Sequence, residues 1–99
     1  MPFVVIAHDH GDEGALERRL KVRPEHMERC EQSVAAGTLL YAVALLDDDE
    51  RMIGSVMVVD LPSRDDVEQW LAEEPYQRDD IWERIEITRG RVGPWFGTT

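Results

Sequence analysis

Four short apolar runs are spaced along this 99-residue chain, separated by more polar stretches. They favour β-strands, since they are rich in β-branched and aromatic residues and bounded by turn-forming ones. The runs span Phe3–Ala7, Thr38–Leu46, Met52–Asp60 and Ile81–Thr88. In the first, both alternating faces are apolar, which predicts a buried central strand. In the last, alternation predicts Ile81, Ile85 and Ile87 on one face and Trp82 and Arg84 on the other.

A helix is predicted over residues 24–36, where Met27, Cys30 and Val34 recur as an apolar stripe. Pro24 suits its first turn, where a missing N–H costs nothing, and residues 15–20 are expected to form a helical turn leading into it. Gly37 stands where a helix commonly ends. His26 lies beside the stripe, so we expect it at the rim of whatever the helix covers.

A second helix is predicted to open at Ser63, with Asp66 three residues later as a variant of the capping box. Its apolar stripe includes Val67 and Leu71. Pro75 should end it, because the residue before a proline avoids the α region. Residues 77–80 are expected to be a polar connector.

The predicted element order is β-α-β-β-α-β, which is typical of an α+β ferredoxin-like fold with an antiparallel sheet and helices on one face. We expect one domain over residues 1–99, with a C-terminal tail from about residue 90. The helices can cover only one face of the sheet. The other, apolar face calls for a partner, and a second copy packed sheet to sheet is the favoured one. The apolar pair Trp95-Phe96 in the tail could clasp that neighbour.

The net charge of the chain limits the kinds of partner that it can bind. The chain carries 11 basic and 21 acidic side chains, a formal net charge of −10. Nucleic acids and anionic membranes both need positive surface, so neither is expected as a partner. The one dense basic cluster comprises Arg18, Arg19, Lys21 and Arg23. A negatively charged substrate would be held there.

A cytoplasmic location is expected. Cys30 is the single cysteine, so no intrachain disulfide can form. The apolar run near the N-terminus is too short for a signal peptide core and lacks a basic lead. Nothing reaches the length of a membrane-spanning segment.

His26 is the candidate general acid or base, because an imidazole titrates close to neutral pH. A carboxylate that holds the ring would fix its tautomer and raise its basicity. Asp9, at the end of the first strand, and Glu74, before a proline, are the two candidates, and the sequence leaves the choice open.

Four further residues are candidates for substrate binding. Arg19 and Arg23 could hold an anionic group by forked hydrogen bonds. Ser55 and Tyr76 could donate hydrogen bonds to a substrate oxygen.

The sequence does not favour a metal site. His8, His10 and His26 would supply three imidazoles, enough for zinc, but a role as loop residues explains the first two as well. Residues 47–50 are four consecutive acids without the glycine and distal glutamate of a calcium loop, so we expect a solvated hairpin turn. No nucleotide or flavin motif is present, and no cofactor is expected.

Several short motifs, in order, resemble the YciI-like (YCII-related) family of the dimeric α/β-barrel superfamily, over nearly the whole chain. The matching pieces are Phe3–Asp9, Glu17–Leu20, Arg23–Met27, Gly37–Leu40, Gly54-Ser55 and Glu74–Tyr76. Two pieces depart from the family pattern. A "GP" after the second strand is replaced by Ala42-Val43-Ala44, and the family's "DP" is Glu74-Pro75.

The resemblance implies a pocket centred on a histidine and a carboxylate, and an enzymatic role; one relative is a dehydrochlorinase. The first hypothesis is therefore a small homodimeric enzyme. In it, His26, supported by Asp9 or Glu74, moves a proton on a small polar or aromatic metabolite in lyase or isomerase chemistry. The alternative is a non-catalytic binding or assembly module that serves a larger enzyme. Replacing His26 by alanine would separate the two.

Overall fold

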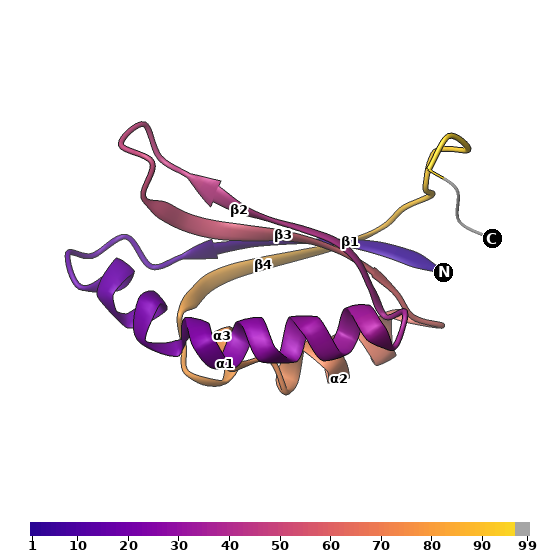
Figure 1. The fold of residues 1–99 in the computed structure, drawn as a ribbon, viewed down its shortest axis with the longest axis horizontal. Coiled ribbons are helices and arrows are strands. Elements are labelled where there is room, and N and C mark those ends of the chain that lie inside the picture. Colours follow the sequence, from indigo (N-terminus) through magenta and orange to yellow (C-terminus); the bar gives the residue numbers. More distant parts are fainter. Residues whose placement is uncertain (97–99) are drawn as a thin grey trace.

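The computed structural model describes residues 1–96 as a sheet with helices packed on one side (Figure 1). The elements are β1 (Pro2–Asp9), α1 (Ala15–Ala35), β2 (Leu39–Leu46), β3 (Met52–Asp60), α2 (Arg64–Ala72), α3 (Pro75–Arg78) and β4 (Trp82–Arg89). The sheet is antiparallel with strand order β2-β3-β1-β4. The ferredoxin-like prediction is therefore confirmed, with the short α3 as an addition. Positions 97–99 of the predicted tail lie outside the described residues.

The core lies between the sheet and the helices. Alternation on β1 directs Phe3, Val5 and Ala7 toward the helices, where all three are buried. Met57 and Val59 of β3 lie on the same side, and Val67 and Leu71 of α2 pack onto them, as the predicted stripe required. As predicted, β1 is central, between β3 and β4.

The predicted alternation along β4 is wrong at its start. Trp82 pairs with Asp9, whereas Arg84 pairs with His8, so Glu83 is an extra residue in the ladder. Such a bulge shifts the following side chains by one position. Trp82 therefore lies on the helix side with Ile85 and is buried.

Helix α1 is longer than predicted, and Pro24 lies inside it rather than at its head. An internal proline removes one backbone hydrogen bond and bends the helix. In Figure 1 the first turns of α1 run at an angle to the rest. Residues 15–20 are thus part of the same helix, because the tertiary contacts of that first segment outweigh the proline penalty.

The buried face of α1 is not the predicted apolar stripe. Met27 and Val34 are 48% and 59% exposed, and Leu20 lies on the same exposed side. The buried positions include Arg19, His26 and Ser33, each seven residues from the next. His26 is therefore enclosed rather than at a rim. The polar face is buried because other elements supply partners for it, which helical periodicity cannot reveal.

The segment between α2 and β4 differs in part from the prediction. Ser63 caps α2 as predicted and accepts a hydrogen bond from the Asp66 N–H. Pro75 follows the end of α2, but it also occupies the first turn of α3, where a proline is well tolerated. The expected connector at residues 77–80 is thus partly helical. This short helix places Glu74 and Tyr76 beneath α1.

One turn and one glycine match their predictions. The acidic residues 47–50 form the β2–β3 turn, where the Asp47 carboxylate accepts the N–H groups of Asp49 and Arg51. A Cβ on Gly54 would stand 2.4 Å from the Ala7 carbonyl oxygen. The backbones of β1 and β3 therefore approach closely there, as a glycine within a strand suggested.

The face of the sheet away from the helices, here called the open face, is apolar over β1, β2 and β3. Register places on it Val4, Ile6, Tyr41, Val43, Val56 and Val58. Tyr41 is 70% exposed. None of the helices in residues 1–96 is both long enough and apolar enough to cross a membrane.

Candidate active site

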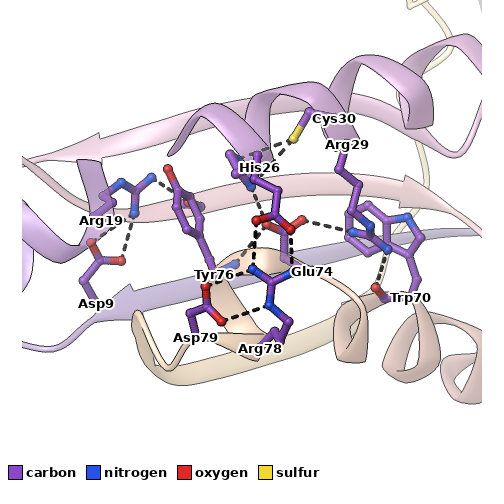
Figure 2. A network of polar contacts seen from close by, with 12 residues as sticks. Asp9, Arg19, His26, Arg29, Cys30, Trp70, Glu74, Tyr76, Arg78 and Asp79 are labelled. Carbon is purple, nitrogen blue, oxygen red and sulfur yellow. Dashed lines mark hydrogen bonds and ion pairs between the residues drawn. The ribbon is translucent and has the colours of Figure 1, made fainter. Parts of the chain in front are cut away.

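The Nδ1 atom of His26 is hydrogen-bonded to the Glu74 carboxylate, which comes from the residue before α3 (Figure 2). The Glu74 side chain is completely buried, and that of His26 is 11% exposed. The structure thus brings His26 together with one of its two candidate carboxylates. Asp9 lies elsewhere and does not contact the ring.

Glu74 is surrounded by donors. Its Oε2 atom accepts from Arg29 Nη1 at 3.0 Å, and its Oε1 atom accepts from the Tyr76 N–H at 3.3 Å. These two donors hold Glu74 as a hydrogen-bond acceptor, so in the neutral imidazole Nδ1 of His26 is the nitrogen that carries the proton toward it. In that tautomer the other ring nitrogen, Nε2, has its lone pair free to act as a base.

Arg29 is itself held in place. Its Nη2 atom donates to the Trp70 carbonyl at 2.6 Å, and its guanidinium lies 4.5 Å from the centre of the Trp70 ring. The Arg29 side chain is only 17% exposed. A fixed cation beside a buried carboxylate compensates part of the cost of burying that charge.

The His26 ring is packed from more than one side. Tyr76 stacks on it, with ring centroids 4.0 Å apart and planes 17° apart. The Cys30 sulfur lies 3.4 Å from Nε2 and 3.9 Å from Nδ1. These similar distances place the sulfur away from the direction of the Nε2 lone pair, which stays available. Burial raises the pKa of the Cys30 thiol to about 11, so at neutral pH it is a neutral packing group.

Asp9 pairs with Arg19 instead. Arg19 Nη1 donates to both Asp9 oxygens, at 2.9 and 3.0 Å, and Nη2 donates to the Ser55 hydroxyl at 2.9 Å. Both charged side chains are 3% exposed. Burial raises the pKa of Asp9 despite the opposing effect of the Arg19 guanidinium. Arg19 also lies 4.5 Å from the centre of the Tyr76 ring, so this group adjoins the His26 group.

A groove of about 830 Å³ runs between α1 and the β2 edge of the sheet. Its polar end is lined by Arg19, Arg23, His26, Ser55 and Tyr76. The remaining lining includes the acidic residues Glu28 and Glu31 but is mostly apolar, with Pro24, Met27, Val34, Leu39, Ala42, Ala44 and Met57. The Ala42-Val43-Ala44 segment that replaces the family's "GP" therefore borders the groove. An amphipathic ligand with one polar end fits this lining.

Two buried polar atoms at the polar end have no partner among the described residues: the Tyr76 hydroxyl and Arg19 Nε. Unpaired buried donors are rare and call for an explanation. Burial raises the pKa of Tyr76, which keeps its hydroxyl protonated and able to donate. Both atoms belong to residues that line the groove, although the atoms themselves are closed off from solvent, so a ligand oxygen would pair with them only after a neighbouring side chain moves.

The predicted basic cluster divides in space. Arg18 is bound to Asp12 at the surface, and Lys21 is exposed. Arg23 is exposed and lines the groove, and Arg19 is buried at its polar end. Arg19 and Arg23 are thus the two residues of the cluster that line the groove.

The structure does not bring His8, His10 and His26 together as a metal site. His10 contacts Asp80 and Glu83 at 3.1 and 3.4 Å, away from His26. Among residues 1–96, the three side chains close enough to suggest a metal are His26, Cys30 and Glu74. They do not fit one well, since Nδ1 is hydrogen-bonded to Glu74 and the Cys30 sulfur lies away from the direction of the Nε2 lone pair.

Sequence reasoning missed Arg29 and the position of Cys30. The spacing of four residues between Glu25 and Arg29 suggests an ion pair on the solvent side of the helix, but Arg78 binds Glu25 instead. The signal that points to Arg29 is its position three residues after His26 on one helix, which lets both side chains reach the same carboxylate.

Comparisons with known proteins agree with the fold and the motifs. The model of the YCII-related domain matches residues 1–91. Protein YciI of Escherichia coli is 28% identical over 93 residues, covering 88% of this chain and 93% of that protein. "Derivative of benzaldehyde biosynthesis cluster protein C" of Emericella nidulans is 30% identical over 70 residues, covering 64% and 71%.

Among solved structures, this chain is similar to 5-chloro-2-hydroxyhydroquinone dehydrochlorinase from Burkholderia phenoliruptrix, in complex with 2,5-dihydroxybenzoquinone. The TM-score is 0.81 at 21% identity, over 94% of this chain and 96% of that one. At this identity the likeness concerns the fold alone. The match of the domain model over residues 1–91 and the similarity to YciI together show that this chain belongs to the YciI-like family of YCII-related domains.

Proposed function

We propose that this protein is a small-molecule enzyme in which His26 moves a proton and Glu74 orients it. The observation that carries the proposal is the His26–Glu74 hydrogen bond, with a fully buried carboxylate, at the wall of a groove of about 830 Å³. A buried carboxylate holds the imidazole in one tautomer and stabilises the cation formed when Nε2 takes a proton. The longer glutamate in place of the family's aspartate still reaches the ring.

The chemistry follows from these groups. Nε2 of His26 accepts a proton from the substrate, and the imidazolium returns it to a leaving group or to another substrate atom. Arg19 or Arg23, with the Tyr76 hydroxyl, would stabilise negative charge that develops on a substrate oxygen. Such lyase or isomerase chemistry needs only the acid–base pair and an oxygen-binding end.

A small aromatic or quinonoid molecule with an ionisable oxygen is the substrate class that fits. The mostly apolar groove suits a flat apolar body, and its polar end offers cations and a phenol donor. The names of two similar proteins point the same way: one acts on a chlorinated hydroxyhydroquinone, and the other belongs to a benzaldehyde-derivative cluster.

A homodimer is the assembly that we propose. The open face leaves several β-branched and aromatic side chains exposed, and a second copy packed on it by a two-fold axis would cover them.

The test uses 2,5-dihydroxybenzoquinone as a binding probe and 5-chloro-2-hydroxyhydroquinone as a trial substrate. We expect His26→Ala and His26→Gln to lower turnover by about 10²- to 10⁴-fold with the far-UV circular dichroism unchanged. Glu74→Gln should lower it less, because the ring keeps a neutral hydrogen-bond partner. His10→Ala is the matched control, since His10 also contacts carboxylates but lies outside the groove.

Binding without turnover in the wild type, with affinity unchanged by His26→Ala, would contradict the enzyme proposal and favour the binding module. Turnover that persists in both His26 variants would show that His26 takes no part in the reaction.

A further inference from the structure

The C-terminal segment from Gly90 to Phe96, here called the arm, leaves the sheet with two large aromatic side chains uncovered. Trp95 is 85% exposed and Phe96 is 71% exposed. Figure 1 shows the arm rising from the end of the sheet on the side away from the helices, which is the side of the open face. A hydrogen bond from the Gly90 N–H to the Pro2 carbonyl joins the start of the arm to β1, and one from the Phe96 N–H to the Gly93 carbonyl closes a turn within the arm.

A hollow of about 730 Å³ lies between the arm and the open face. Its floor includes Pro2, Val4, Tyr41 and Val58, and Arg91 is the single charged residue among those that line it. One surface of the described chain thus carries both an exposed aromatic projection and an apolar depression. A two-fold interface has this self-complementary form, because each copy offers both parts to the other.

Charge favours a second copy as the occupant. A chain of net charge −10 repels its own copies, so an uncharged surface is the favoured place for two copies to meet. The middle of the open face over β1, β2 and β3 is such a surface, and alternation places His8 and Asp60 only at its ends, with Arg84 and Glu86 on the adjoining β4. Further acidic residues lie on the exposed side of α1 and in the β2–β3 turn.

We infer that the arm grips a second copy of this chain, with Trp95 as its buried anchor on the open face of the partner. The two aromatics would bury about 150–250 Å² each, against roughly 800 Å² per partner in a stable interface. The arm alone is therefore insufficient, and the remainder comes from the adjoining open face. This inference rests on the homodimer in the proposed function but not on the proposed chemistry.

The test is sedimentation velocity over a dilution series, together with ¹⁹F NMR of protein labelled with 5-fluorotryptophan. We expect the Trp95 signal, assigned with Trp95→Phe, to lose its H₂O/D₂O isotope shift in the dimer and to regain it on dilution. Trp95→Ala should raise the dissociation constant of the dimer about 30-fold or more. Leu20→Ala, at an exposed apolar residue of α1, is the matched control and should leave the constant unchanged.

The outcomes distinguish the role of the arm from the existence of the homodimer. A dimer in which Trp95 keeps its isotope shift, or in which Trp95→Ala dissociates no more readily than wild type, overturns the role of the arm and leaves the homodimer standing. A chain that is monomeric throughout overturns both, while the acid–base proposal is decided separately by turnover. Because Trp95 is exposed in the single chain, its substitution does not disturb the core.

Discussion

The Tyr76 ring lies parallel to the His26 ring at 4.0 Å, yet its hydroxyl has no hydrogen-bond partner among the described residues. The ring therefore has a structural role in supporting the imidazole, and the hydroxyl does not. A buried hydroxyl without a partner costs about 1–3 kcal/mol. This unpaired donor beside the groove is what a binding site for a ligand oxygen requires.

Tyr76→Phe should separate these two roles. We expect the free energy of unfolding to stay unchanged or to rise, because an unpaired polar atom is removed while the stacked ring is kept. Binding of 2,5-dihydroxybenzoquinone should weaken by about 1 kcal/mol, the net value of one hydrogen bond. Urea unfolding and isothermal titration calorimetry measure the two effects. A clear loss of stability would mean that the hydroxyl has a structural partner such as a bound water.

Asp9→Ala should destabilise the fold, because it leaves the Arg19 guanidinium buried without its carboxylate. Breaking a buried pair by removing one partner typically costs about 3–5 kcal/mol. The control is Glu68→Ala, which breaks the exposed pair with Arg64 at 3.3 Å and should cost about 0.3–0.5 kcal/mol. Urea unfolding of the two variants gives the comparison, and equal costs would contradict the structural role assigned to Asp9.

Gly54→Ala should be destabilising although alanine is small. The new Cβ would lie 2.4 Å from the Ala7 carbonyl oxygen, so β1 and β3 would have to move apart. Overpacking of this kind costs about 1–3 kcal/mol. Gly11→Ala is the matched control, because nothing lies within 4 Å of its added Cβ. Thermal unfolding of both variants tests this, and a neutral Gly54→Ala would mean that the strands are farther apart.

Cys30 should make stability fall at alkaline pH. Burial raises its pKa to about 11 from an ordinary value of 9.0. Between these values the unfolded chain releases the thiol proton while the folded chain keeps it, so the free energy of unfolding falls as pH rises from about 9 to about 11. Urea unfolding at several pH values should show this fall reduced in Cys30→Ala.

Alkylation by iodoacetamide gives an independent measurement of the same thiol, because only the thiolate reacts. Its rate should rise with a midpoint near pH 11 in the folded protein. A midpoint near 9 would show that the thiol is solvated and that it does not pack against His26 as described.

Much of the fold could be predicted from the sequence, since strands, turns and helix ends depend on local residue chemistry. The β3 bounds, the Ser63 cap and the close approach at Gly54 all follow from nearby residues. The bulge at Glu83 and the continuation of α1 through Pro24 could not be predicted in this way. Each depends on contacts with distant parts of the chain, which compete with local preferences.

The sequence by itself determined the order of the strands and the two longer helices, the family and most of the residues from which a site could be built. The tertiary structure alone decided how they pair: His26 with Glu74, and Asp9 with Arg19. The two carboxylates are equivalent as local chemistry, and only their positions on β1 and before α3 distinguish them. The same holds for α1, which buries Arg19 and His26 rather than its apolar stripe, because their partners lie 10 and 48 residues away along the chain.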